Sequence, residues 1–335
     1  MTCFQRIVSG IAASSAAAGA MLSPIAAQAA QSTAQTIRSL EQRINAIEGD
    51  ILAITRDRHH RMTVPVQISG EGPFDFMVDT GAQATVVTPK LSERFAMTPT
   101  GTATLVGMSS KAQVTMVDFD GLQFAGRQLD NLRSPLLLER NIGADGILGL
   151  DSLQGLRVMI DFRDRTMTVG DAFEDDSSDG FEIVVRARRK LGQMIITHAE
   201  VDGVKTAIII DTGAQGSVGN MALQRRMRGR TSGQTIATDV NGVTTSSDLF
   251  TARQVMISGL ALSRVPVSFA DGPAFAALGL DKRPALILGM QSLRSFDRVA
   301  IDFASRQILF DLPVGTRKRT RGRRPIAAGS QRGNL

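Results

Sequence analysis

The chain has almost no cysteine: Cys3 is the only one among 335 residues. A small fold held together by a disulfide framework is therefore excluded, because such a fold needs several paired cysteines. Tryptophan and tyrosine are absent, and aromatic residues make up only 4% of the chain. Apolar residues nevertheless make up 43%. A chain of this length and composition has enough apolar material for two domains with hydrophobic cores.

Long apolar runs are also missing, except near the N-terminus. Arg6 precedes an Ala-rich apolar run over residues 7–22, and Ala27-Gln28-Ala29 offers a small-x-small cleavage site. These features predict a signal peptide over residues 1–30 and a secreted, periplasmic protein. Retention of the run as a membrane anchor is the alternative, although the run is short for a span of about 20 residues.

An excess of basic over acidic residues is confined to one segment. The net charge is +6 at pH 7, and residues 313–335 alone carry seven basic residues and no acid. The rest of the chain is therefore nearly neutral, which argues against a nucleic-acid-binding body and against nucleic acid as a partner. The basic tail has two interpretations. It makes a weak contact with an anionic surface such as lipid or cell-wall polymer, or it is a disordered, solvated end.

One stretch of the chain occurs twice. The sequence Asp-Thr-Gly-Ala-Gln begins at Asp79 and again at Asp211, and each copy follows a short apolar run. A short, bounded apolar run is typical of a buried strand. Asp and Gly together indicate a turn, which brings a carboxylate to the end of that strand. Two copies with matched flanks indicate an internal repeat.

The repeat extends well beyond this motif. Residues 147–153 and 287–293 share the pattern of an apolar pair, Gly, and a later Ser-Leu, and residues 157–162 match residues 298–303. The duplicated unit is therefore about a hundred residues long, the size of one small domain. We expect a first lobe over residues 61–170 and a second over 181–312. An acidic, turn-rich linker over 171–180 joins them.

The duplicated motif resembles the aspartic protease superfamily, and within it the retropepsin-like family. The resemblance covers residues 61–312 and suggests two fused Asp-Thr-Gly-Ala domains in one bacterial-type secreted chain. It implies a mainly β fold of two pseudo-symmetric β-barrel lobes of the acid protease type. Asp79 and Asp211 take the places of the catalytic residues. The residues that would support the active-site loops are Thr80, Gly81, Ala82, Thr212, Gly213 and Ala214. The pairs Leu148-Gly149 and Leu288-Gly289 resemble the strand that packs behind each loop.

Two adjacent carboxyls suit peptide hydrolysis without a metal or cofactor. They share one proton, so one acts as a base for water and the other as an acid for the carbonyl oxygen. The expected function is an aspartic endopeptidase acting on protein or peptide substrates. Ala82 and Ala214 carry no hydroxyl that could stabilise the charged carboxylates, so we expect a milder acid optimum than in pepsin-like enzymes. A non-catalytic peptide-binding module on a protease fold is the alternative, and a scaffold protein is a third hypothesis.

Two hairpins are predicted at matching places in the lobes. Gly107 lies between two β-like runs, and it follows Asp79 at nearly the same interval at which Gly242 follows Asp211. Asn241-Gly242 is a strong hairpin signal. In the family such hairpins are flaps over the substrate; an ordinary surface hairpin is the alternative at each place. Pepsin-like enzymes carry a Tyr in the flap, and this chain has none.

Residues 31–60 form a separate predicted element. Six apolar residues between Ile37 and Ile54 follow a heptad spacing, which predicts an N-terminal amphipathic helix over residues 32–57. It would be a coiled coil that supports self-association, a prosegment helix, or a helix packed on its own protein. His59 and His60 follow it without the partners of a metal site. His198 is expected at the surface.

Overall fold

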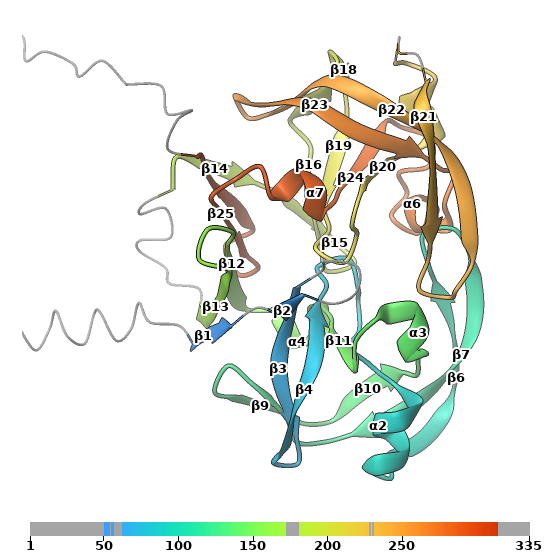
Figure 1. Cartoon of the computed structure of the whole chain (residues 1–335), viewed down its shortest axis with the longest axis vertical. Helices are drawn as coiled ribbons and strands as arrows, with labels where there is room; N and C mark the ends of the chain where they lie inside the picture. Colours follow the sequence, from blue (N-terminus) through green and yellow to red (C-terminus); the bar gives the residue numbers. More distant parts are fainter. Residues whose placement is uncertain are drawn as a thin grey trace, which may run out of the picture. The chain divides into compact units, whose positions relative to one another are not determined.

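The computed structural model describes residues 50–53, 55–56, 62–171, 181–227, 229 and 231–313. The predicted signal peptide, linker residues 172–180 and tail residues 314–335 lie outside the described residues. The two repeats form two curled β lobes, which confirms the mainly β fold with two lobes (Figure 1). Within the described part of the chain, no helix has the length and apolar character needed to span a membrane.

Lobe one is built on a sheet of strand order β5-β11-β4-β3-β8-β9, with β2 added beside β3, and on a smaller sheet of order β10-β7-β6. Its strands are β2 (Thr55–Arg56), β3 (Met62–Ile68), β4 (Glu71–Val78), β5 (Val86–Val87), β6 (Thr98–Val106), β7 (Lys111–Phe119), β8 (Leu122–Phe124), β9 (Arg127–Leu129), β10 (Leu132–Pro135) and β11 (Gly146–Leu148). Its helices are α2 (Pro89–Arg94), α3 (Glu139–Ile142) and α4 (Leu150–Leu153).

Lobe two has one larger sheet of order β15-β16-β19-β24-β20-β23-β22-β17-β18, with β21 paired to β22. Its strands are β15 (Arg188–Lys190), β16 (Gln193–Ile196), β17 (Ala199–Val201), β18 (Val204–Lys205), β19 (Ala207–Ile210), β20 (Ser217–Gly219), β21 (Thr231–Thr238), β22 (Thr244–Ile257), β23 (Leu260–Phe269) and β24 (Ala285–Leu288). Its helices are α5 (Met221–Gln224), α6 (Pro273–Ala277) and α7 (Met290–Leu293).

A six-stranded sheet joins the two lobes. Its order is β1-β13-β12-β25-β26-β14, so lobe one supplies the first three strands and lobe two the last three. The bounds are β1 (Asp50–Ala53), β12 (Leu156–Asp161), β13 (Thr166–Asp171), β14 (Ile183–Arg186), β25 (Arg298–Asp302) and β26 (Gln307–Asp311). At its centre β12 and β25 run antiparallel, with Met159 opposite Ala300. The matched segments recognised in the sequence thus pair with each other.

The predicted helix over residues 32–57 is wrong at its C-terminal end. Asp50–Ala53 is strand β1, paired with β13, and Thr55–Arg56 is strand β2, paired with β3. β-Branched Ile51 and Thr55 favour strands, and two open sheet edges supply backbone partners that outweigh the heptad spacing. The remaining helix residues lie outside the described part. Lobe one therefore begins at residue 50 rather than at 61.

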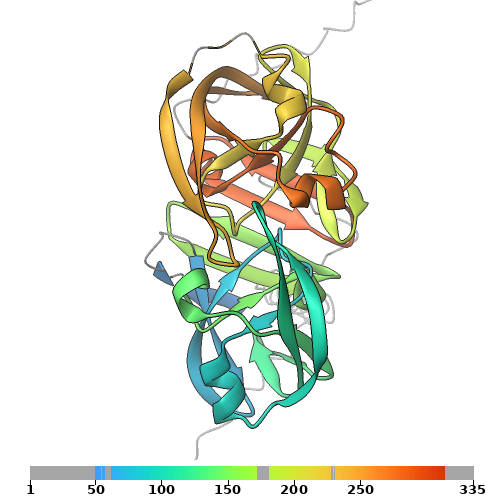
Figure 2. The ribbon, with the colours of Figure 1, turned by 90° about the vertical axis from the view of Figure 1, so that its right-hand side faces the viewer.

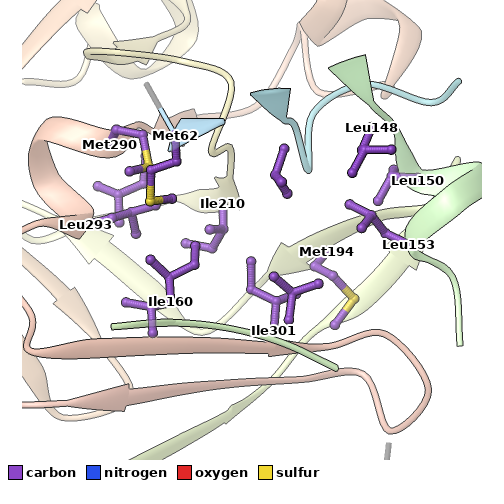
Figure 3. Packing of buried hydrophobic residues seen from close by; sticks show 14 of the residues in the cluster. Met62, Leu148, Leu150, Leu153, Ile160, Met194, Ile210, Met290, Leu293 and Ile301 are labelled. Atoms are coloured by element: carbon purple, nitrogen blue, oxygen red, sulfur yellow. The ribbon is translucent and has the colours of Figure 1, made fainter. Parts of the chain in front are cut away.

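The hydrophobic core runs through both lobes. Strand β3 alternates buried and exposed residues over its second half, as expected for a sheet with one face on the core. The labelled side chains of Figure 3 belong to a single buried cluster. Met62, Leu148, Leu150, Leu153 and Ile160 come from lobe one, whereas Met194, Ile210, Met290, Leu293 and Ile301 come from lobe two. Each lobe thus completes the core of the other.

Candidate active site

Each Asp-Thr-Gly loop begins where a buried strand ends. Strand β4 runs parallel to β11, and β19 runs parallel to β24. The last residues of β11 and β24 hold the loops, because Asp79 N donates to Leu148 O at 3.1 Å and Asp211 N donates to Leu288 O at 3.2 Å. Strand β19 is buried along its whole length, which explains its continuous apolar sequence.

The glycines after β11 and β24 let the chain pass close behind the loops. A Cβ added to Gly149 would collide with the carbonyl group of Ala84, and a Cβ on Gly289 would collide with Gly216 O. Any side chain would therefore displace the backbone of the loop. The predicted packing of Leu148-Gly149 and Leu288-Gly289 behind the loops is confirmed.

The two loops are tied together by their threonines. Thr80 Oγ1 donates to Ile210 O at 3.0 Å, and Thr212 Oγ1 donates to Val78 O at 2.8 Å. In return, Thr80 N donates to Thr212 Oγ1 at 3.0 Å and Thr212 N donates to Thr80 Oγ1 at 3.2 Å. Both threonines are buried. Hydrogen bonds between buried groups hold the two loops in one relative position.

This brace brings the two carboxylates together. Asp79 Oδ1 accepts from Gly81 N at 2.7 Å and Ala82 N at 3.1 Å. Asp211 Oδ1 accepts from Gly213 N at 2.9 Å and Ala214 N at 3.0 Å. One oxygen of each carboxylate is thus fixed by its own loop.

The glycines of the two loops let each carboxylate approach the opposite loop. A Cβ on Gly81 would lie 2.6 Å from Asp211 Oδ2, and a Cβ on Gly213 would collide with the Asp79 carboxylate. The structure thus brings together all eight residues that the sequence assigned to the catalytic pair and its loops.

The two carboxyl groups affect each other's protonation. Burial and the neighbouring Asp79 carboxylate raise the pKa of Asp211 from its ordinary 3.8 to about 8, against the opposing effect of the Ala214 and Gly213 N–H groups. Two neighbouring buried carboxyl groups hold one proton between them. Ionising both would place two like charges side by side in a poorly hydrated site. At neutral pH the pair therefore holds one proton.

The predicted hairpins are present, with Gly107 and Gly242 in their turns. Strands β6 and β7 flank residues 107–110, and β21 and β22 flank residues 239–243. Gly242 has φ of +82°, a left-handed conformation that favours glycine. Figure 2 shows the two hairpins extending from opposite lobes so that their tips meet between the lobes.

A buried carboxylate joins the two tips. Asp239 Oδ2 accepts from Ser110 Oγ at 2.6 Å and from Ser109 N at 3.3 Å. Asp239 Oδ1 meanwhile accepts from Asn241 N and Val243 N, both at 3.0 Å, within its own turn. The same side chain therefore shapes one tip and binds the other.

Each tip also docks on the opposite lobe. Met108, from lobe one, packs against a lobe-two cluster that contains Phe275 and Ile287, and a Cβ on Gly272 would collide with Met108 O. Val240, from lobe two, packs against a lobe-one cluster, and its carbonyl accepts from Asn141 Nδ2 at 3.3 Å. The hairpins are therefore exchanged between lobes at their tips.

Comparison with known protein families finds an aspartyl protease family for each half of the chain. Residues 64–155 match the family described as the putative aspartyl protease of gag polyproteins, and residues 197–292 match the family described as aspartyl protease. The chain carries two retropepsin-like aspartyl protease domains in tandem. No curated protein matches the chain.

The retropepsin-like domains contain a second layer of support that sequence reasoning missed. In the first domain Thr85 N and Oγ1 donate to Asp151 Oδ1, at 2.8 and 2.7 Å, and Thr85 Oγ1 lies 2.6 Å from Ser152 Oγ. In the second, Ser217 Oγ lies 2.9 Å from Ser292 Oγ. Thr85 and Ser217 are separated by the same interval as Asp79 and Asp211. Both residues lie within the repeated stretch, and their matching position is the signal that could have indicated a supporting role.

The three histidines of the chain lie outside this site or outside the described residues. His198 is exposed, as expected. His59 and His60 lie outside the described residues. Among the residues that the structure describes, no three His, Cys, Asp or Glu side chains gather in a way that could hold a metal ion.

Proposed function

We propose that the protein is an aspartic endopeptidase that hydrolyses peptide bonds in extended segments of protein or peptide substrates. The observation that carries this proposal is the pair formed by Asp79 and Asp211, two braced carboxylates of which one holds a proton at neutral pH. Membership of the aspartyl protease families supports a protease-type function.

In the first step, the ionised Asp79 takes a proton from a water molecule as the water oxygen bonds to the substrate carbonyl carbon. Asp211 gives its proton to the carbonyl oxygen at the same time. The product is a neutral gem-diol, and the proton of the pair now resides on Asp79 instead of Asp211. No charge accumulates on the substrate, which matters in a site with little water.

In the second step, Asp79 gives its proton to the amide nitrogen and the C–N bond breaks. One gem-diol hydroxyl returns its proton to Asp211 as the carbonyl re-forms. The pair then has its starting protonation, with an amine and a carboxylic acid as products. The loop N–H groups that bind one oxygen of each carboxylate keep both side chains in place through this cycle.

The hairpins support an extended substrate. Their tips are hydrogen-bonded to each other and docked on both lobes, so we propose that they act as flaps which open to admit a single strand and then close over it. Apolar Ala82 and Val240 border one buried cluster, and Ala214 and Met108 border the other. These surroundings favour apolar side chains beside the scissile bond.

The test is hydrolysis of a denatured protein library, followed by sequencing of the new peptide ends. We expect wild-type protein to cut the library and a statine-type inhibitor, which mimics the gem-diol, to block it. Asp79→Asn and Asp211→Asn should each abolish cutting. Asp164→Asn, which alters an exposed carboxylate in the β12–β13 turn, is the matched control and should cut normally.

Binding of library peptides without cleavage would instead favour the non-catalytic peptide-binding module. Cleavage that survives in both Asp→Asn variants would place the chemistry elsewhere.

We also propose that the protein works outside the cytoplasm, in the periplasm. The support is the sequence of residues 1–30, with a basic start, an Ala-rich apolar run and a small-x-small site. Cell fractionation and N-terminal sequencing of the mature chain test this. A cytoplasmic protein that begins at Met1 would contradict it.

A further inference from the structure

The β15–β16 hairpin of lobe two reaches into lobe one. A Cβ on Gly192 would lie 2.9 Å from Leu150 Cδ1, and Arg189 Nη1 lies 3.5 Å from Gln154 Oε1. Gln193 is the next residue, at the start of β16. The hairpin therefore carries Gln193 from one lobe to the catalytic loop of the other.

Gln193 binds directly to that loop. Its Nε2 donates to Gly81 O at 2.6 Å. Gly81 is the residue whose Cα lies against the Asp211 carboxylate. The side-chain amide is thus separated from the catalytic pair by a single residue, and its donor half has a fixed partner.

The acceptor atom of the same amide, Gln193 Oε1, has no hydrogen-bond partner among the described residues. Gln193 Oε1 is buried, and no group in the part of the chain that the structure describes donates to it. Because Gly81 O requires the NH₂ group, the amide cannot be flipped to hide the oxygen. A buried acceptor without a donor is unfavourable and rare in native proteins. Such an atom beside a catalytic pair points to a donor that arrives with the substrate.

We infer that Gln193 positions the substrate: its Oε1 accepts a hydrogen bond from one backbone N–H of the bound peptide, close to the scissile bond. This inference rests on the proposed function and deepens it. A peptide N–H brought beside the pair loses its water and needs an acceptor, just as Oε1 needs a donor. The repeat has Arg61 in the corresponding place, and an arginine side chain has donors but no acceptor.

Recognition of a peptide N–H by Gln193 predicts discrimination against proline at one substrate position. A peptide with proline at the position facing Gln193 has no N–H to donate and leaves Oε1 unpaired. Such a peptide is rejected relative to one with alanine there, by about tenfold. Proline at other positions lacks this particular cost.

The experiment uses a decapeptide, the tightest-binding member of a pooled library, and derivatives methylated at one backbone nitrogen each. Binding is measured by fluorescence anisotropy to the full-length Asp79→Asn protein, with and without Gln193→Met, which keeps length and apolar character but removes the amide. We expect N-methylation at one position to weaken binding about tenfold, and to have little effect at that position with Gln193→Met.

The control is Gln154→Met, an exposed amide in the same hairpin contact, which should leave the N-methyl pattern unchanged. In the enzyme with Asp79 intact, Gln193→Met should raise KM with little change in kcat. If no methylated position loses its sensitivity in Gln193→Met, the inference is wrong even when the enzyme cuts peptides. If the pattern appears but wild type cuts nothing, the proposed function alone fails. If no peptide binds and wild type cuts nothing, both are overturned.

Discussion

Asp79 and Asp211 lie in loops of identical sequence, and the proposed mechanism gives them different tasks. Each accepts two backbone N–H groups from its own loop. Burial and the facing carboxylate raise the pKa of Asp211 to about 8, so the pair holds one proton at neutral pH. In the proposed mechanism Asp211 is the acid and Asp79 the base, an assignment that the motif itself does not make.

The first prediction concerns the pH dependence of peptide cleavage. The acid in the first step is protonated Asp211, so activity should fall as pH rises through about 8. It should also fall in acid, when the second carboxylate takes up a proton and no base remains. A pH profile of kcat/KM on a peptide substrate checks this. A maximum near pH 2 would contradict it, and would also contradict the milder optimum expected from Ala82 and Ala214.

The second prediction concerns stability at the same residue. In the unfolded chain Asp211 ionises near 3.8, whereas in the folded protein its pKa is about 8. The folded state therefore binds more protons between these values, and its stability falls as pH rises through that range. Asp211→Asn removes the loss, so its melting temperature at pH 8 should exceed that of wild type by about 5 °C.

The difference between Asp211→Asn and wild type should shrink towards pH 4. Thermal melts at a series of pH values measure it, with Asp164→Asn as the exposed control. A variant that melts below wild type at pH 8 would show that Asn cannot replace the protonated carboxyl in this packing.

Among the elements, the two hairpins are coupled by one side chain. Asp239 shapes its own turn and accepts from Ser110 and Ser109 of the other hairpin. Asp239→Ala should therefore loosen both tips, including the one that carries no mutation. Amide hydrogen exchange should rise about tenfold or more at residues 107–110 and 239–243.

Asp248→Ala is the control for this third prediction, because Asp248 is exposed on the same hairpin, away from the tip. It should leave exchange at both tips unchanged. If Asp239→Ala affects only residues 239–243, the two hairpins move independently.

Much of this architecture could be predicted from the sequence, because the same structural motifs occur in both copies of the repeat. The motif at Asp79 and Asp211, Gly149 with Gly289, and the turns at Gly107 and Gly242 are all local patterns with a direct structural meaning. They predicted the lobes, the paired loops and the hairpins.

The contacts between the halves could not be predicted in the same way. The contact between the hairpin tips depends on Asp239, and the contact with Gly81 O is made by the Gln193 side chain. Neither residue is repeated at the matching position of the first lobe. Strand β1 was not predicted, because its residues continue a heptad spacing that favours a helix. The interval between Ile51 in β1 and Ile183 in β14 equals that between Asp79 and Asp211, so the repeat extends to these strands. Only the pairing partner decides between helix and strand there.

At the scale of the whole molecule, the fourth prediction is that one chain forms one complete active site. Thr80 and Thr212 of the same chain brace the loops, and strands of the same chain form the joining sheet. Asp79→Asn and Asp211→Asn should each lower kcat/KM by about a thousandfold or more. Mixing the two variants should restore nothing, because each chain lacks one member of its only pair.

Substantial activity in either variant alone would indicate sites formed by like lobes of two chains. Recovery on mixing would indicate that lobe one of one chain pairs with lobe two of another.

The six-stranded sheet has a consequence for how the molecule moves. Strands β12 and β25 are hydrogen-bonded neighbours at its centre, from Arg157 opposite Asp302 to Asp161 opposite Arg298. Hinge rotation of one lobe against the other would have to break this ladder and the shared core beneath it. The joining sheet and the shared core therefore oppose domain closure, the usual route by which two-lobed enzymes enclose a ligand. We therefore expect access to the carboxylates to depend on the hairpins, and turnover of the proposed endopeptidase to be limited by how often their tips separate.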